Sequence, residues 1–266
     1  MKYLAMFNMK YLATISITAF LLTNSITTAQ IQSAHLRKDS LVQVSSGVPI
    51  KYQGANHGVT NRQMPARLYT NHCLSDARKT EDKVLTALIP KYNPVLTTSE
   101  NPTFFFYLPK TSKTYVKAFD FILENANKEV VYQESFKINN QPGVFKISVP
   151  AKLNQPLLKI NQDYRWIFSA ICDYSDRSRD LVVGGYLKRI NLEKSLTTNL
   201  QKTSLRERAA ILAASGIWDD SLKTLAELRF KKFQDAGLKA DWQTLLESVD
   251  LAKIAQEPLV GELKAK

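Results

Sequence analysis

The feature that most constrains this chain is an alternation of apolar and polar residues between Leu85 and Ile190. Successive side chains of a β-strand point to opposite faces, so a two-residue period predicts strands with one buried face. Turn signals such as Gln141-Pro142-Gly143 separate the runs, and no helical period interrupts them. We therefore expect residues 81–191 to form an all-β sandwich domain of about seven antiparallel strands.

One of the expected strands is apolar on both faces. Thr103–Leu108 reads TFFFYL, which predicts a strand covered on both sides. An aromatic platform for stacking against carbohydrate is the alternative interpretation of this run. The full set of expected strands is Leu85–Pro90, Thr103–Leu108, Tyr115–Glu124, Val130–Ile138, Phe145–Val149, Tyr164–Cys172 and Leu181–Ile190.

The residues at the start of the sixth expected strand indicate which type of β-sandwich the chain forms. Leu158, Asn161, Tyr164 and Trp166 resemble the structural corner of immunoglobulin-like and fibronectin type III domains. Asn161 stands where glycine is usual, and asparagine tolerates a positive φ better than most residues. The resemblance implies an immunoglobulin- or fibronectin-like fold, with the Tyr164 hydroxyl hydrogen-bonded to the backbone just upstream.

After Ile190 the apolar period becomes 3.6, which predicts a C-terminal helical region over residues 192–266. Ser204 and Glu207 form a capping-box pattern at the start of the second helix. Asp219 and Asp220 open the third helix, where we expect carboxylates to favour the positive end of the helix dipole. The expected helices are Leu192–Thr203, Leu205–Ala214, Asp219–Phe230 and Ala240–Val249, followed by Leu251–Ala255.

The middle two helices have the residue sizes of a packed hairpin. Ala209, Leu212, Gly216, Trp218, Ser221 and Leu225 resemble the packing positions of one tetratricopeptide-type hairpin. A single hairpin cannot bury its own apolar face. We expect it to pack on the sandwich, on the final helix or on a partner.

Residues 1–29 have the features of a signal peptide. Lys10 precedes the apolar run Tyr11–Leu22, and Thr27-Thr28-Ala29 is a small-residue cleavage site. The run is short for a membrane span of about 20 residues, although an uncleaved anchor is the competing interpretation. MKYLA occurs at both Met1 and Met9, so translation could start at either. We expect an exported protein, periplasmic or extracellular.

Residues 30–80 lack periodicity and predict a flexible basic arm. The net charge is +12, and removal of residues 1–29 would take away Lys2 and Lys10 but no acid, leaving +10. A basic chain favours anionic lipid or glycan partners. Because the charges are scattered rather than clustered, solubility alone is the favoured explanation of the positive charge. We expect no nucleic-acid partner.

The chain has two cysteines, Cys73 and Cys172. In an oxidising compartment such a pair predicts one disulfide, and two buried thiols are the alternative. A bridge closing a loop of roughly 100 residues would constrain the unfolded chain by about 4.7 kcal/mol.

No catalytic, cofactor or metal site is evident in the sequence. All three histidines, at positions 35, 57 and 72, precede the expected core. The weak candidate polar site is Asp173, Asp176 and Asp180, whose oxygens could hold calcium. Arg177 and Arg179 lie among these acids, which favours a loop neutralised by its own ion pairs.

Five segments resemble a cyanobacterial exported family, domain of unknown function 928. They are Leu85–Pro90, Asn101–Pro109, Tyr164–Asp173, Leu205–Arg229 and Trp242–Pro258. The resemblance runs from about Cys73 to Pro258, and it implies export and a domain extent but no activity.

These observations predict a non-enzymatic extracytoplasmic binding or protein-interaction module without a cofactor. Its partner would be an envelope or sensory protein. The alternatives are a binder of anionic polysaccharide or a membrane surface, and a hydrolase with an unrecognised site that uses Asp173, Asp176 or Asp180.

Overall fold

The computed structural model describes residues 49–54, 64–67, 85–91, 94–110, 116–138, 141–151 and 156–266. The strands in these ranges are β1 (Met64–Arg67), β2 (Thr86–Ala87), β3 (Val95–Thr97), β4 (Thr103–Leu108), β5 (Ala118–Asn125), β6 (Val130–Phe136), β7 (Gly143–Ser148), β8 (Asp163–Ile171), β9 (Leu181–Arg189) and β10 (Leu259–Glu262). The helices are α2 (Lys194–Lys202), α3 (Leu205–Ala214), α4 (Trp218–Lys231) and α5 (Ala236–Glu247), with a 3-10 turn η1 at Arg177–Arg179.

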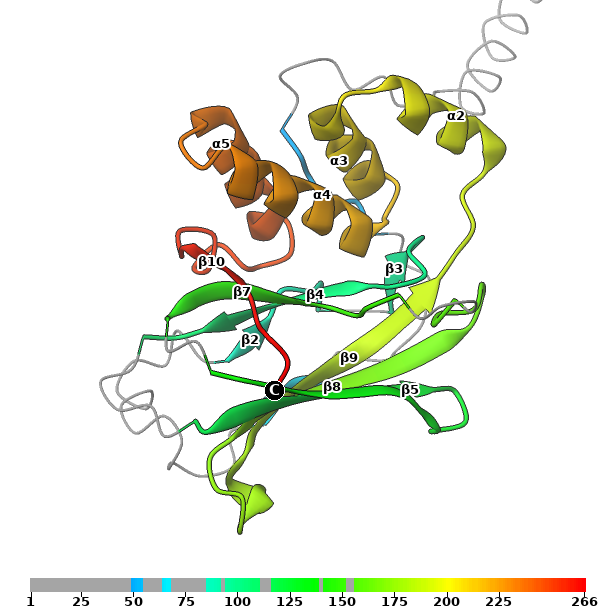
Figure 1. The fold of residues 1–266 in the computed structure, drawn as a ribbon. Helices are drawn as coiled ribbons and strands as arrows, with labels where there is room; N and C mark the ends of the chain where they lie inside the picture. The colour runs from blue at the N-terminus through cyan, green and yellow to red at the C-terminus, as the bar shows by residue number, and fades with distance from the viewer. Residues whose placement is uncertain are drawn as a thin grey trace, which may run out of the picture. The chain divides into compact units, whose positions relative to one another are not determined.

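The described residues form two sheets and a helical layer (Figure 1). The larger sheet has the order β1-β9-β8-β5-β6, with β3 also paired to β9, and the smaller has the order β10-β7-β4-β2. Helices α3, α4 and α5 lie on the side of the smaller sheet that faces away from the larger one (Figure 1). The prediction of a mostly β region followed by helices is confirmed.

The sheets are not wholly antiparallel, which corrects the prediction. β3 runs parallel to β9, and β10 runs parallel to β7. β10 falls in the region predicted to be helical, and its conformation is set by its partner strand: Val144 donates its N–H to Pro258 O at 2.7 Å. The approach is so close that a Cβ on Gly143, whose φ is 133°, would lie 2.5 Å from the same oxygen.

The segment that follows β10 continues across to the larger sheet. Leu263 donates its N–H to Lys146 O of β7, and Lys266 donates its N–H to Ser135 O of β6. Ala265 forms an isolated antiparallel bridge with Phe136. Residues 259–266 therefore contact the outer strands of both sheets.

The core between the sheets is aromatic. Phe106 of β4 stacks on Phe168 of β8 with ring centroids 4.1 Å apart, and Phe104 lies 5.5 Å from Trp166. Because side chains alternate along β4, the neighbouring Phe105 and Tyr107 face the helical layer. Every residue of β4 is buried, so the prediction of a strand covered on both sides is confirmed.

The helices begin and end where capping groups are available. Ser204 and Glu207 form the expected capping box of α3, and Gly216, with a φ of 74°, follows its end. α5 begins four residues before the predicted Ala240, because Asp235 accepts a hydrogen bond from Leu238 N–H at 3.0 Å. Residues 251–255 form turns, and the helix predicted there is absent.

The predicted sandwich and helical regions share one hydrophobic core. Trp218 and Trp242 belong to the same buried cluster as Phe104 and Phe106. Trp218 Nε1 also donates a hydrogen bond to Leu88 O at 2.9 Å. The boundary placed at residue 191 therefore does not divide the packing.

Two described pieces of the segment predicted to be a flexible arm contact the rest of the structure. Ile50 is 0% exposed, Tyr52 packs edge-on against Trp218, and Gln53 donates its N–H to Ala213 O at 3.0 Å. β1 pairs with β9. Only a few residues anchor each piece, too few to give a periodic pattern in the sequence.

The predicted signal peptide, Cys73 and the three histidines lie outside the described residues. No helix within the described ranges is long and apolar enough to span a bilayer.

Candidate functional site

The predicted corner residues lie at the entry to β8. Leu158 is 0% exposed and Trp166 1% exposed, both in the main core. Asn161 has a φ of 60°, and its N–H donates to Arg189 O at 2.7 Å. The Tyr164 hydroxyl accepts a hydrogen bond from the Lys159 N–H at 2.8 Å. These contacts give the four residues a structural part in closing the loop before β8.

The acidic loop after β8 pairs its acids with its own arginines. Arg177 contacts Asp180 at 2.5 Å and Asp120 of β5 at 3.0 Å, while Arg179 contacts Asp176 at 3.0 Å. Hydrogen bonds from Ser175 lower the pKa of Asp173. Across the described residues, no three His, Cys, Asp or Glu side chains are grouped to hold a metal ion.

Cys172 lies in the core at the end of β8. It is 6% exposed, and its Sγ lies 3.1 Å from Arg179 O. Since Cys73 is not among the described residues, the disulfide between them stays a prediction.

Asp219 and Asp220 occupy a site that the sequence did not predict. Both acids lie in the first turn of α4, as expected for the positive end of the helix dipole, but neither caps the helix: the N-cap is Ile217, and α4 has no side-chain capping hydrogen bond. Both carboxyls reach from α4 to β3 instead. Thr97 Oγ1 lies 2.9 Å from Asp219 Oδ2 and 2.9 Å from Asp220 Oδ2. Thr98 donates its N–H and its hydroxyl to Asp220, at 2.9 and 2.6 Å.

The two short contacts of Thr97 Oγ1 require a second proton in addition to the hydroxyl hydrogen of Thr97. A hydroxyl has one hydrogen, so Thr97 cannot donate to both carboxyls. Burial and the neighbouring Asp220 carboxylate raise the pKa of Asp219 to about 8. A protonated Asp219 can donate to Thr97 Oγ1, which then donates to Asp220, and each group is satisfied. The pair is thus a hydrogen-bonded link between the helical layer and the larger sheet.

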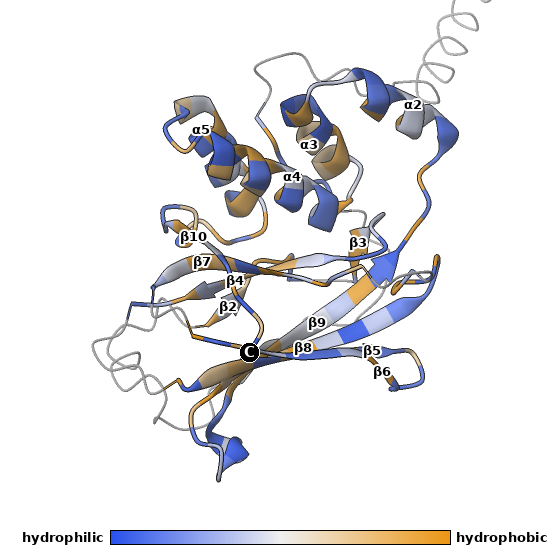
Figure 2. Ribbon diagram, in the orientation of Figure 1, coloured by the Kyte–Doolittle hydropathy of each residue, from blue (hydrophilic) through white to orange (hydrophobic). Residues whose placement is uncertain are grey.

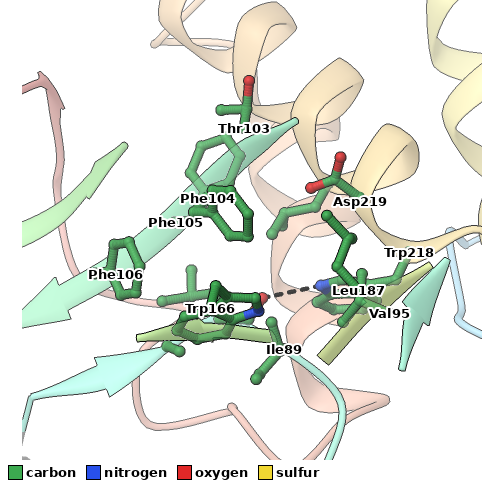
Figure 3. A pocket seen from close by; sticks show the side chains of 13 residues that line it. Ile89, Val95, Thr103, Phe104, Phe105, Phe106, Trp166, Leu187, Trp218 and Asp219 are labelled. Carbon is green, nitrogen blue, oxygen red and sulfur yellow. Dashed lines mark hydrogen bonds between the residues drawn. The ribbon is translucent and has the colours of Figure 1, made fainter. Parts of the chain in front are cut away.

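Asp219 borders a cavity too small for a substrate. Its volume is about 10 Å³, the space of about one water molecule. Figure 3 shows aromatic and aliphatic side chains around it, including Phe104, Trp166 and Val95. A carboxyl with a raised pKa is a frequent sign of catalysis. The small cavity and the hydrogen bond to Thr97 give the Asp219 carboxyl a structural role instead.

Asp220 also lines an open groove between α2 and the α3–α4 hairpin, with a volume of about 340 Å³. Leu192, Leu200 and Leu212 supply apolar walls. α2 itself is hydrophilic along most of its length, in contrast to α3 (Figure 2). The charged residues of the groove are Arg208, Asp220, Lys223 and Glu227.

The groove has unused hydrogen-bonding capacity. Arg208 donates one hydrogen bond, to Leu200 O at 2.9 Å, while its Nε is buried without a partner. Neither Lys223 nor Glu227 forms an ion pair with another described residue. Ligand sites combine apolar walls with a few polar groups that can bind.

A second hollow, of about 360 Å³, lies over the larger sheet near the β5–β6 turn. Four of its five charged residues already pair with each other, Glu124 with Arg165 at 3.4 Å and Asp163 with Lys188 at 3.7 Å, and Lys128 is the fifth. The groove at α2 therefore offers more to a ligand.

Comparison with known proteins gives a family but no activity. A family model described as Domain of Unknown Function (DUF928) matches residues 60–259 of the 266. No curated protein and no solved structure matches the chain. Since the family match spans the greater part of the chain, including both sheets and the helical layer, the protein belongs to the DUF928 family.

Proposed function

We propose that this protein is a non-enzymatic, exported binding module whose ligand is a short peptide segment held in the groove between α2 and the α3–α4 hairpin. The observation that carries the proposal is the 340 Å³ groove, in which Lys223, Glu227 and the Nε of Arg208 remain available for binding. The one strongly perturbed carboxyl of the described residues, Asp219, borders a cavity too small for a substrate, which favours binding over catalysis.

A peptide suits this groove better than an anionic polymer. A peptide presents apolar side chains, charges and backbone hydrogen-bonding groups within a few residues. An anionic glycan would be repelled by Asp220 and Glu227, which line the same groove as the cations. The free acceptors of a peptide carboxylate match Arg208 and Lys223.

The hairpin face itself is a weaker candidate. Its apolar side chains Trp218, Leu222 and Leu225 are at most 2% exposed and belong to the main core. The contact of Ser221 Oγ with Ala209 O, at 2.7 Å, supports a tetratricopeptide-type pairing of α3 and α4. We place the ligand beside this hairpin and not on its apolar face.

The strand order supports an immunoglobulin- or fibronectin-like sandwich as a further part of the proposal. Among the seven strands expected from the sequence, the first, second and fifth are β2, β4 and β7 of the smaller sheet. The third, fourth, sixth and seventh are β5, β6, β8 and β9 of the larger sheet. Greek-key sandwiches distribute their strands in this way.

The groove is tested by selecting a displayed random peptide library on the purified protein. We expect enriched peptides that carry an acidic residue. Lys223→Glu should weaken their binding by about tenfold or more, because one charge reversal in a partly buried site changes the sign of the interaction. Glu227→Lys should strengthen the binding of these peptides.

The matched control is Lys194→Glu, which lies on the exposed start of α2 and outside the groove. It should change peptide binding less than about threefold. Failure to enrich any peptide, or equal effects of the Lys223 and Lys194 variants, contradicts the proposal.

Export is tested by fusing residues 1–40 to a phosphatase reporter that is active only in an oxidising compartment. We expect activity from the fusion and none when Leu21 and Leu22 are replaced by arginine, since charge interrupts the apolar segment. Thiol counting on the protein recovered outside the cytoplasm should find no free thiol before reduction and two after it. Two free thiols before reduction would exclude the disulfide, and an inactive reporter would exclude export.

A further inference from the structure

The end of α4 and the start of its connection to α5 carry an exposed pair of phenylalanines next to two lysines, Phe230-Lys231-Lys232-Phe233. Phe233 is 74% exposed and Phe230 37% exposed, while both lysines are exposed. Phe233 is the most exposed large hydrophobic side chain of the described residues. We name these four residues the basic-aromatic tip. Large exposed apolar side chains that gather in one place mark interaction sites.

The tip is held outward by local hydrogen bonds. Lys232 donates its N–H to Leu228 O at 2.9 Å, and Asp235 donates its N–H to Lys232 O at 3.0 Å. The Asp235 carboxylate then caps α5 through Leu238 N–H. These bonds fix the backbone on both sides of Phe233, whose side chain is exposed.

The interior behind the tip is already filled. Arg229 lies over the Trp242 ring, 5.2 Å from its centroid, and burial lowers the pKa of this arginine. Trp242 is 0% exposed. The Arg229 side chain thus covers the buried indole of Trp242.

The lysines of the tip are free to meet anions. Neither Lys231 nor Lys232, nor the nearby exposed Lys239, forms an ion pair with another described residue. The acid closest in sequence, Asp235, uses its carboxylate to cap α5. Residues 229–239 contain four cations and one acid, a net charge of +3.

We propose that the basic-aromatic tip docks on an anionic lipid surface, a property separate from peptide binding in the groove. Phenylalanine inserts at the boundary of headgroups and acyl chains, and lysines beside it attract anionic headgroups. A hydrated polysaccharide would satisfy the lysines but would leave the unsubstituted Phe233 ring in water. Lipid is the occupant that uses both components of the tip.

Vesicle binding by the full chain tests this docking. The probes are vesicles of phosphatidylcholine with 30% phosphatidylglycerol and vesicles of phosphatidylcholine alone. The measured quantity is the ratio of the two affinities, since the apolar run near the N-terminus contributes to both. Each lysine near an anionic surface contributes roughly fivefold to affinity, so Lys231→Glu with Lys232→Glu should lower the ratio by about 25-fold or more. High salt should lower it as well.

The control variants match the tip in charge and aromaticity. Lys110→Glu with Lys137→Glu removes the same charge from exposed positions in the sandwich, and Tyr174→Ser removes another exposed aromatic ring. We expect Phe233→Ser to weaken binding to the mixed vesicles by roughly tenfold and Tyr174→Ser by less than about twofold. Equal losses in tip and control variants would show that overall charge acts without a docking site, which overturns the proposal.

A fluorescent variant reports insertion directly. All three native tryptophans are at most 1% exposed, so Phe233→Trp adds the one exposed indole of the described residues. On mixed vesicles its emission should shift to shorter wavelength and be quenched by brominated acyl chains. Absence of both changes, even with retained vesicle binding, means that the tip does not enter lipid, which overturns the proposal.

Discussion

Replacing Asp219 with asparagine should make the protein more stable at pH 8, and the gain should shrink as the pH falls towards 4. Burial and the Asp220 carboxylate raise the pKa of folded Asp219 to about 8, whereas an unperturbed aspartate titrates near 3.8. Between these pH values the folded state binds one more proton than the unfolded state. The free energy of unfolding of the wild type therefore falls as the pH rises through this window and levels off above about pH 8.

Asparagine removes this pH dependence because it is neutral throughout. Its amide can donate to Thr97 Oγ1 as the protonated carboxyl does, and its oxygen can accept the hydrogen bond that Asp219 receives from the Thr103 backbone. One pKa unit corresponds to about 1.4 kcal/mol. Allowing for one unmet amide hydrogen, we expect a gain on the order of 2–4 kcal/mol at pH 8, or roughly 5–10 °C in Tm.

The matched control is Asp220→Asn, one residue along the same helix. Asp220 accepts from Thr97, from the Thr98 N–H and from the Thr98 hydroxyl. An amide cannot accept at both of its terminal atoms, so this variant should lose about 1–3 kcal/mol. Thermal melts of both variants between pH 4 and pH 9 measure these changes in stability. A loss of stability in Asp219→Asn that is equal at all pH values would mean that folded Asp219 is ionised.

A fragment of residues 85–191, the sandwich region by itself, should fail to fold. In the full chain the helical layer covers the outer side of β4, where Phe105 is 4% exposed and Tyr107 is 2% exposed. Removing the helices would expose these rings and would take away Trp218, the hydrogen-bond donor to Leu88 O. Each large apolar side chain transferred to water costs about 1.5–3 kcal/mol. Several such losses approach a domain's whole net stability of roughly 5–15 kcal/mol.

Far-ultraviolet circular dichroism and thermal melts test this expectation. The fragment should show no cooperative transition, while residues 44–266 should show a single one. A fragment that melts cooperatively would restore the two-domain division predicted from the sequence. Two separate transitions in the longer chain would do the same.

Local patterns in the sequence predicted the elements that local rules govern. The two-residue alternation located β5 to β9, and the uninterrupted apolar run TFFFYL located β4, which is buried on both faces. The capping box at Ser204 and the glycine at position 216 located α3. β1, β3 and β10 were not predicted because they have only four, three and four residues. Such short strands take their conformation from a partner strand, which a single sequence does not reveal.

The roles of the candidate site residues also depend on partners that are distant in the sequence. The helix dipole is a local argument, and it accounts for Asp219 in the first turn of α4 but not for its hydrogen bonds. The group that decides the role of this carboxyl is Thr97, which lies 122 residues away. Phe233 and its lysines are visible in the sequence, but their exposure becomes evident only in the folded structure.

Residues 259–266 protect the molecule from its own sheet edges. β7 and β6 are outer strands whose free backbone groups could pair with another chain, and the same eight residues occupy both. A single proteolytic cut before Leu259 would therefore uncover two templates for strand addition at once. Clipped molecules should associate through these edges and form aggregates, so the integrity of this short segment limits strand addition between copies of the chain.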